Sequence, residues 1–260
     1  MQLVDSGRKM LVVAMDHGRA MGPVQGLEDP GRVIDMVIDA GADALMTSFG
    51  IVKRYNEKLI GTIETYMRLD GGPSLIREKW LENSEWQLLH DVALAHEMGA
   101  AGGCVMYFMG APCESATMQI VADTALDSFG LELPLMVEAL PCRHPGIPDT
   151  NDAQMMADAC RIAFEHGADI LKTYYPGTVD GFRKVVEGTP APVLIAGGPK
   201  LDSDLAVLEM VAGTIEAGGK GVVFGRNIWQ HANPAGMVRA LRAIIHDGVA
   251  AREAEGLLRS

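Results

Sequence analysis

The sequence predicts an α/β fold, a (β/α)8 barrel, and three observations support this fold class. Short, almost continuously apolar runs alternate with segments whose apolar residues have helical spacing, an order typical of a parallel sheet covered by helices. A glycine-containing step precedes several of these runs, at Gly41, Gly99, Gly167 and Gly218, because glycine adopts the left-handed conformation that ends a helix. The apolar runs number eight, as the barrel requires. A doubly wound open sheet is the alternative, but no G-x-G-x-x-G follows the first run.

The strands are predicted where a run is short, apolar and bounded by glycine, proline or charged residues. In chain order they are residues 9–18, 43–50, 59–66, 102–109, 133–140, the stretch 168–177 that closes on a Pro-Gly turn, 191–198 and 221–225.

The helices are predicted from helical spacing and from the residues at their ends. Pro30 after Asp29 is typical of a first turn, and Gly99 and Gly167 end two of the helices. The predicted helices are residues 30–40, 52–58, 86–98, 114–128, 152–166, 179–187, 202–217 and 234–246, with a last one from residue 249. The long segments 67–84 and 142–150 are predicted as loops, and loops of such length often carry function.

Composition limits the possible partners and location. The 260 residues suffice for a single domain over 1–260, and 48% of them are hydrophobic. The formal net charge of −12 argues against nucleic acid and anionic membranes as partners. The four cysteines form no C-x-x-C pair, and no apolar run approaches a membrane helix or a signal peptide. We therefore expect a cytoplasmic protein with reduced thiols.

Lys172 carries the functional prediction. It lies in an apolar strand beside Ile170 and Leu171, although lysine is depleted in strands and rarely buried without a partner. Burial favours the neutral amine, which attacks carbonyl carbon to form a Schiff base. The stretch alone is equally consistent with a lysine that pairs with a barrel carboxylate or extends to the strand end.

Other polar residues are predicted at the C-terminal strand ends, where parallel barrels place their sites. They are Asp16, His17, Glu64, Tyr107, Glu138, Tyr174 and Tyr175. Asp16 and Glu138 could move protons near Lys172, or could form a structural ion pair with it. His17 and His144 raise the question of a metal site, but no H-x-H or H-E-x-x-H spacing occurs. We therefore predict no metal and no cofactor.

Glycine-rich segments follow the last two strands, at Gly197-Gly198 and Gly225-Arg226. Barrels commonly bind phosphate there, and glycine lets backbone N–H groups approach an anion closely. We predict that Gly197, Gly198, Gly225 and Arg226 bind a substrate phosphate. The alternative is two tight turns and a surface arginine.

Four motifs of the chain are distinctive when taken together: Asp16-His17-Gly18 with Gly22-Pro23 and Gly26-Leu27-Glu28, Lys172-Thr-Tyr-Tyr175, Gly197-Gly198-Pro199-Lys200 and Gly225-Arg226-Asn227-Ile-Trp-Gln230. With them the chain resembles the class I aldolase superfamily, most closely the branch of archaeal-type fructose-bisphosphate aldolase, 2-amino-3,7-dideoxy-heptulosonate synthase and hydroxy-phosphonooxypentanedione thiolase. The resemblance spans nearly the whole chain, from residue 9 to the final helix.

The resemblance implies a barrel with Lys172 as the Schiff-base lysine, Asp16 assisting proton transfer and the two glycine segments holding phosphate. It also implies a homo-oligomer, with a decamer as an expected size. One departure concerns proton transfer: the aldolase and the heptulosonate synthase carry a tyrosine before a proline on the fifth strand, whereas Leu140 precedes Pro141 here. Related aldolases of the tagatose-bisphosphate type use a strand glutamate, so Glu138 is the expected substitute, with Tyr107 and Tyr175 as alternatives.

Three functions remain open at this level. The first is a class I aldolase that cleaves or forms a carbon–carbon bond in a phosphorylated ketose through an imine on Lys172. Arg143 and Lys53 are the candidates for binding a second anionic group. The second is a thiolase-type acyl transfer from a phosphorylated diketone to coenzyme A on the same lysine. The third is a phosphate-binding barrel without catalysis, in which Lys172 fills an ion pair.

Overall fold

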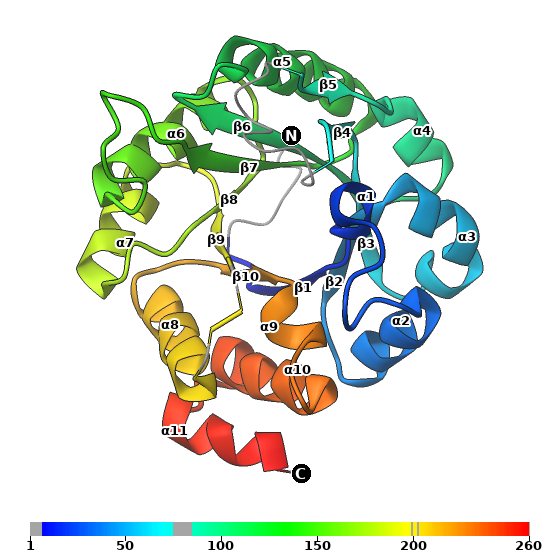
Figure 1. Cartoon of the computed structure of the whole chain (residues 1–260), viewed down its shortest axis with the longest axis vertical. Helices are drawn as coiled ribbons and strands as arrows, with labels where there is room; N and C mark the ends of the chain where they lie inside the picture. Colours follow the sequence, from blue (N-terminus) through cyan, green and yellow to red (C-terminus); the bar gives the residue numbers. More distant parts are fainter. Residues whose placement is uncertain (1–6, 75–84, 199, 202, 260) are drawn as a thin grey trace.

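Eight parallel strands close into a barrel that is surrounded by helices, as the sequence predicts (Figure 1). The computed structural model describes residues 7–74, 85–198, 200–201 and 203–259. Around the barrel the strands follow the order β1-β10-β9-β8-β7-β6-β3-β2. Their bounds are β1 Met10–Ala14, β2 Ala44–Ser48, β3 Glu64–Arg68, β6 Gly102–Met109, β7 Leu135–Pro141, β8 Ile170–Thr173, β9 Val193–Ala196 and β10 Gly221–Phe224.

The outer layer consists of the helices that connect these strands (Figure 1). Several begin at a side-chain cap of the kind that satisfies free N–H groups: Asp29, Thr178 and Ser203 each accept a hydrogen bond from a first-turn amide. The longer helices are α2 Pro30–Asp39, α3 Phe49–Leu59, α4 Val92–Glu97, α5 Glu114–Leu131, α6 Ala153–Glu165, α7 Val179–Glu187, α8 Asp204–Glu216 and α10 Pro234–Arg242. None of the helices in the described residues is long and apolar enough to cross a bilayer.

Short elements complete the chain. They are α1 Gly18–Met21, α9 Arg226–Trp229, α11 Ala251–Ala254, a π-turn at Ala243–Asp247 and a 3-10 turn at Glu255–Arg259. Of these, only α1 and α9 were not predicted, because the others fall in the helices predicted over residues 234–246 and from residue 249. The π-turn continues α10, so the predicted helix 234–246 changes its winding near its end.

Two predicted boundaries are wrong in a way that matters for the site. The third strand runs over Glu64–Arg68 rather than 59–66, because α3 continues to Leu59. The helix predicted from residue 86 begins at Val92, where the Asp91 carboxylate accepts a hydrogen bond from the Leu94 amide. Residues before it form β5 Gln87–Leu88, which pairs antiparallel with β4 Asp70–Gly71. Of the predicted loop 67–84, residues 75–84 lie outside the described part of the chain, as do Pro199 and Asp202.

The barrel interior holds a separate apolar cluster, made of Met10, Val12, Ala14, Ala44, Met46, Tyr66, Cys104, Met136, Ile170, Leu194 and Val223. Side chains two residues apart on a strand face the same way. The next inward position on five of these strands, two residues beyond a cluster member, therefore forms one layer above the apolar core. It holds Asp16, Arg68, Met106, Glu138 and Lys172. The apolar interior thus ends where the charged residues begin.

Candidate active site

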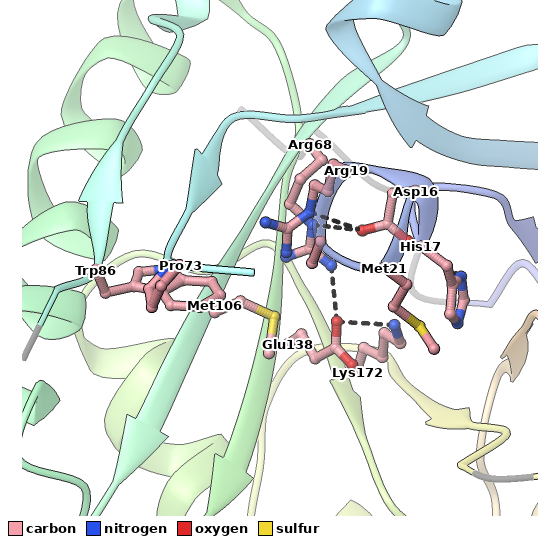
Figure 2. Close-up of a pocket in the computed structure, with 11 residues that line it drawn as sticks. Asp16, His17, Arg19, Met21, Arg68, Pro73, Trp86, Met106, Glu138 and Lys172 are labelled. Carbon is pink, nitrogen blue, oxygen red and sulfur yellow. Dashed lines mark hydrogen bonds and ion pairs between the residues drawn. The ribbon is translucent and has the colours of Figure 1, made fainter. Parts of the chain in front are cut away.

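The charged layer lines a cavity of about 160 Å³ toward the C-terminal ends of the strands (Figure 2). The three residues predicted as catalytic, Lys172, Asp16 and Glu138, all line it. The full lining comprises Asp16, His17, Arg19, Ala20, Met21, Arg68, Pro73, Trp86, Met106, Glu138 and Lys172.

Lys172 and Glu138 lie side by side because their strands pair in register. Glu138 on β7 is the register partner of Lys172 on β8, so the two side chains leave the sheet on the same face. Lys172 Nζ lies 2.8 Å from Glu138 Oε2, and only 5% of Lys172 is exposed. The amine therefore has a carboxylate within proton-transfer distance and almost no contact with solvent.

Arg68 is the main site residue that the sequence analysis missed. Its Nη2 donates to Glu138 Oε2 at 2.7 Å and its Nε donates to Asp16 Oδ2 at 3.0 Å. The guanidinium therefore lies between the two predicted carboxylates (Figure 2). Its side chain is 2% exposed. Arg68 follows the inward-facing Tyr66 by two residues and therefore also faces inward. The sequence prediction missed this because it ended the strand at residue 66.

Asp70 is a third carboxylate that contacts Arg68, and it does not belong to the cavity lining. Its carboxylate accepts hydrogen bonds from Trp86 Nε1 at 2.7 Å and from the Met106 amide at 2.6 Å. The same carboxylate lies 3.5 Å from Arg68 Nη1. Asp70 is fully buried, and its negative charge adds to those of Asp16 and Glu138 around Arg68.

Neighbouring cations govern the ionisation of both cavity carboxylates. Burial alone would raise the pKa of Glu138, but the charges of Lys172 and Arg68 outweigh it and hold that pKa below its usual value. Burial likewise opposes ionisation of Asp16, yet Arg68 and Arg19 hold its pKa well below the ordinary range. The cavity therefore keeps two carboxylates ionised around its cations.

His17 joins the cavity to the glycine segments. Burial lowers the pKa of His17, and Lys172 and Arg226 oppose the effect of Asp16, so the neutral ring is favoured. The ring packs edge-on against Trp229, with 5.2 Å between centroids. A Cβ on Gly225 would lie 2.6 Å from His17 Cε1, so only glycine lets this segment approach the ring.

Asn227 ties the two predicted phosphate segments together. Its Nδ2 donates to the Gly197 carbonyl oxygen at 2.9 Å, and its Oδ1 accepts from the Leu201 amide at 2.9 Å. Gly198 has a positive φ of 60°, which other residues rarely adopt. Arg226 Nε is buried without a hydrogen-bond partner among the described residues. The fold thus brings together the four residues predicted to bind phosphate, beside His17 of the cavity.

Two residues predicted near the strand ends lie elsewhere. Glu64 is the first residue of β3, at the opposite end of the barrel, where it pairs with Arg8 at 2.7 Å. Tyr107 follows Met106 by one residue and so faces the helices, where its hydroxyl donates to Glu114 Oε1 at 2.9 Å.

The remaining alternatives also fall outside the cavity lining. The ring of Tyr175 packs against Phe182, with 5.7 Å between centroids. Arg143 and His144 line a separate surface hollow beyond β7, and Lys53 lies on α3. Of the three candidates to replace the missing strand tyrosine, Glu138, Tyr107 and Tyr175, Glu138 is therefore the one that lies beside Lys172.

Three comparisons place these observations among known proteins. The profile of the DeoC/LacD family aldolases matches residues 10–231. The chain is 32% identical to 2-amino-3,7-dideoxy-D-threo-hept-6-ulosonate synthase of Halobacterium salinarum, over 94% of this chain and 89% of the relative. It is 30% identical to the class 1 fructose-bisphosphate aldolase of the same species, over 95% and 94%.

A solved structure shares the fold closely. It is an archaeal fructose-1,6-bisphosphate aldolase whose catalytic lysine is covalently bound to the carbinolamine intermediate of its substrate. Its TM-score is 0.83 at 28% identity, with 91% of this chain and 94% of that chain covered. None of these three relatives is named as a thiolase, so the acyl-transfer alternative gains no specific support.

Proposed function

The chain belongs to the DeoC/LacD family of aldolases and makes or breaks carbon–carbon bonds through a lysine Schiff base, and we propose that Lys172 is that lysine and that the substrate is a phosphorylated ketose. One observation carries the assignment. Among the described residues that line the cavity, Lys172 is the one lysine, buried and 2.8 Å from a carboxylate.

Imine formation uses the Lys172–Glu138 pair. Glu138 accepts a proton from Nζ, and the free electron pair on nitrogen attacks the ketone carbon to give a carbinolamine. The carbinolamine hydroxyl then takes a proton from Glu138 and leaves as water, so that a positively charged imine remains. Lys172 Nζ lies 2.8 Å from Glu138 Oε2, so this oxygen is within reach of the proton in both steps.

Cleavage uses the imine as an electron sink. A carboxylate accepts the proton of the hydroxyl group on the carbon that departs, and the electrons of the breaking carbon–carbon bond pass to the iminium nitrogen. An aldehyde leaves, and the resulting enamine is protonated on carbon and hydrolysed by water. We assign this proton to Glu138, because Glu138 lies 2.8 Å from Lys172 Nζ, whereas Asp16 pairs with Arg68 and Arg19 and assists by its charge.

The phosphate of the substrate is assigned to the backbone of Gly197, Gly198 and Gly225 and to Arg226. The support is the Asn227 link between the two segments, the unpartnered Arg226 Nε, and the contact of Gly225 with His17 of the cavity. A phosphate held there would orient the carbonyl carbon of a ketose toward Lys172.

Borohydride trapping tests the proposal. The protein is incubated with dihydroxyacetone phosphate or fructose 1,6-bisphosphate, reduced, and analysed by intact mass and peptide mapping. We expect an adduct on Lys172 that Lys172→Met abolishes. The matched control, Lys58→Met, removes a surface lysine that pairs with Asp35 and should trap normally. An adduct on another lysine would refute the assignment.

Location, domain organisation and assembly are further parts of the proposal. One barrel over 1–260 agrees with the single closed sheet, and a reducing, cytoplasmic compartment agrees with the free state of all four cysteines. A homo-oligomer, with a decamer as the expected size, agrees with Leu126 and Phe129 on α5, which are 73% and 65% exposed. Light scattering of the wild type and of Phe129→Lys tests whether this surface joins copies of the chain.

A further inference from the structure

We propose that Arg68 is a positioning residue for the aldol chemistry, which holds Glu138 against Lys172 and fixes Asp16 beside them. The inference rests on the proposed function and adds a residue that neither the motifs nor the comparisons identify. Arg68 lies at the centre of the described charged layer, with a carboxylate on each of three sides.

The guanidinium geometry explains why arginine occupies this position. Three different nitrogens of Arg68 face three different carboxylates: Nη2 faces Glu138, Nε faces Asp16 and Nη1 faces Asp70. A planar fork with donors in fixed directions can serve all three at once, whereas the ammonium of lysine is a single point charge. The site therefore depends on the shape of the side chain as well as on its charge.

The arginine is itself fixed through the sheet. Asp70 is held by the Met106 amide on β6, and Met106 is the register partner of Glu138 on β7. Glu138 is in turn the register partner of Lys172 on β8. Glu138 is therefore held in two ways. The register of β7 with β6 and β8 sets its backbone position, and Arg68, which Asp70 contacts in turn, binds its carboxylate.

Removing the arginine would leave buried carboxylates that repel one another. Such carboxylates cannot all remain ionised, so one of them takes up a proton at a higher pH. Glu138 also loses one of the two cations that hold its pKa down, so its own pKa rises. Glu138 with a bound proton cannot accept one from Nζ, and the acid limb of the rate profile therefore moves upward. The ionisable groups that face Arg68 and Glu138 from the surrounding elements are Asp16, His17, Arg19, Asp70, Cys104, Lys172 and Tyr174.

The test compares kcat and KM across pH for Arg68→Met, Arg68→Lys and wild type, using the ketose phosphate that traps best. For Arg68→Met we expect kcat to fall about 100-fold with KM changed less than about threefold, and the acid limb to rise by about one pH unit. Arg68→Lys should restore the acid limb, because the charge returns, while kcat stays about tenfold low, because the fork is lost.

Controls separate positioning from folding. Arg8→Met removes an arginine that pairs with a carboxylate at the other end of β3, and its kinetics should match wild type. If Arg68→Met does not fold, Arg68→Lys decides, and wild-type kcat in that variant refutes the inference. A change confined to KM, with kcat as in wild type, would also refute it, since it would make Arg68 a substrate-binding group.

The trapping experiment separates this inference from the proposed function. If wild type traps on Lys172 while the Arg68 variants keep the wild-type pH profile, only this inference fails. If wild type does not trap, the proposed function fails.

Discussion

Replacing Glu138 by glutamine should destabilise the fold at neutral pH, because it removes a buried negative charge that two cations share. Glu138 Oε2 lies 2.7 Å from Arg68 and 2.8 Å from Lys172, and its side chain is 12% exposed. Removing one partner of a buried ion pair costs about 3–5 kcal/mol. Glutamine keeps one carbonyl acceptor, so the free energy of unfolding should fall by about 3 kcal/mol, near the lower end of that range.

The pH dependence has a definite sign. The native pKa of Glu138 is lowered by Lys172 and Arg68 in excess of the effect of burial, so ionisation of Glu138 stabilises the folded state. That contribution is fully present above the unfolded pKa of glutamate, about 4.3, and is lost as the pH falls through the lower native pKa. The difference in stability between wild type and Glu138→Gln should therefore be largest near neutral pH and shrink in acid.

Urea unfolding followed by circular dichroism, repeated from about pH 7 to below about pH 4, measures this difference. Glu64→Gln is the matched control, since Glu64 pairs with Arg8 at 2.7 Å but both side chains are more than one-third exposed. An exposed pair contributes about 0–1 kcal/mol, so this variant should lose little. A Glu138→Gln effect that equals the Glu64→Gln effect, or that stays constant with pH, would contradict the electrostatic argument.

Further predictions concern backbone positions and the glycine segments. Gly225→Ala should raise KM for the phosphorylated substrate, because its Cβ would lie 2.6 Å from His17 Cε1, and steady-state kinetics measures this. Asn227→Ala should also raise KM by about tenfold, which corresponds to roughly 1.4 kcal/mol of binding free energy, because the hydrogen bonds that link the two glycine segments are lost. Gly221→Ala should lower the melting temperature far more than Gly248→Ala: both glycines have positive φ, but only at Gly221 would the Cβ meet backbone, 1.9 Å from a carbonyl oxygen of β1.

The sequence was sufficient for the barrel because each strand is a short buried run, and burial on both faces leaves a continuous apolar signal. Helix starts were harder to predict. Trp86 continued a helical pattern toward α4, yet tertiary contacts decided its structure, since the indole donates to buried Asp70 and the next two residues pair with β4. No local pattern encodes a hydrogen bond to a residue in another element, so the boundary followed packing rather than propensity.

The charged residues above the apolar cluster show what strand alternation and register add to a prediction made from residue types alone. Lys172 and Glu138 were predicted because each interrupts an apolar strand, which makes it unusual by itself. Arg68 lies in the same layer. The predicted third strand ends at residue 66, two residues before the observed end, so the prediction assigns Arg68 to a loop. Counting inward positions from the apolar cluster in steps of two reaches Asp16 and Arg68 by the same rule that reaches Lys172. Alternation along a strand, once its end is fixed, thus identifies the side chains that meet, whereas residue type alone identifies those that are unusual.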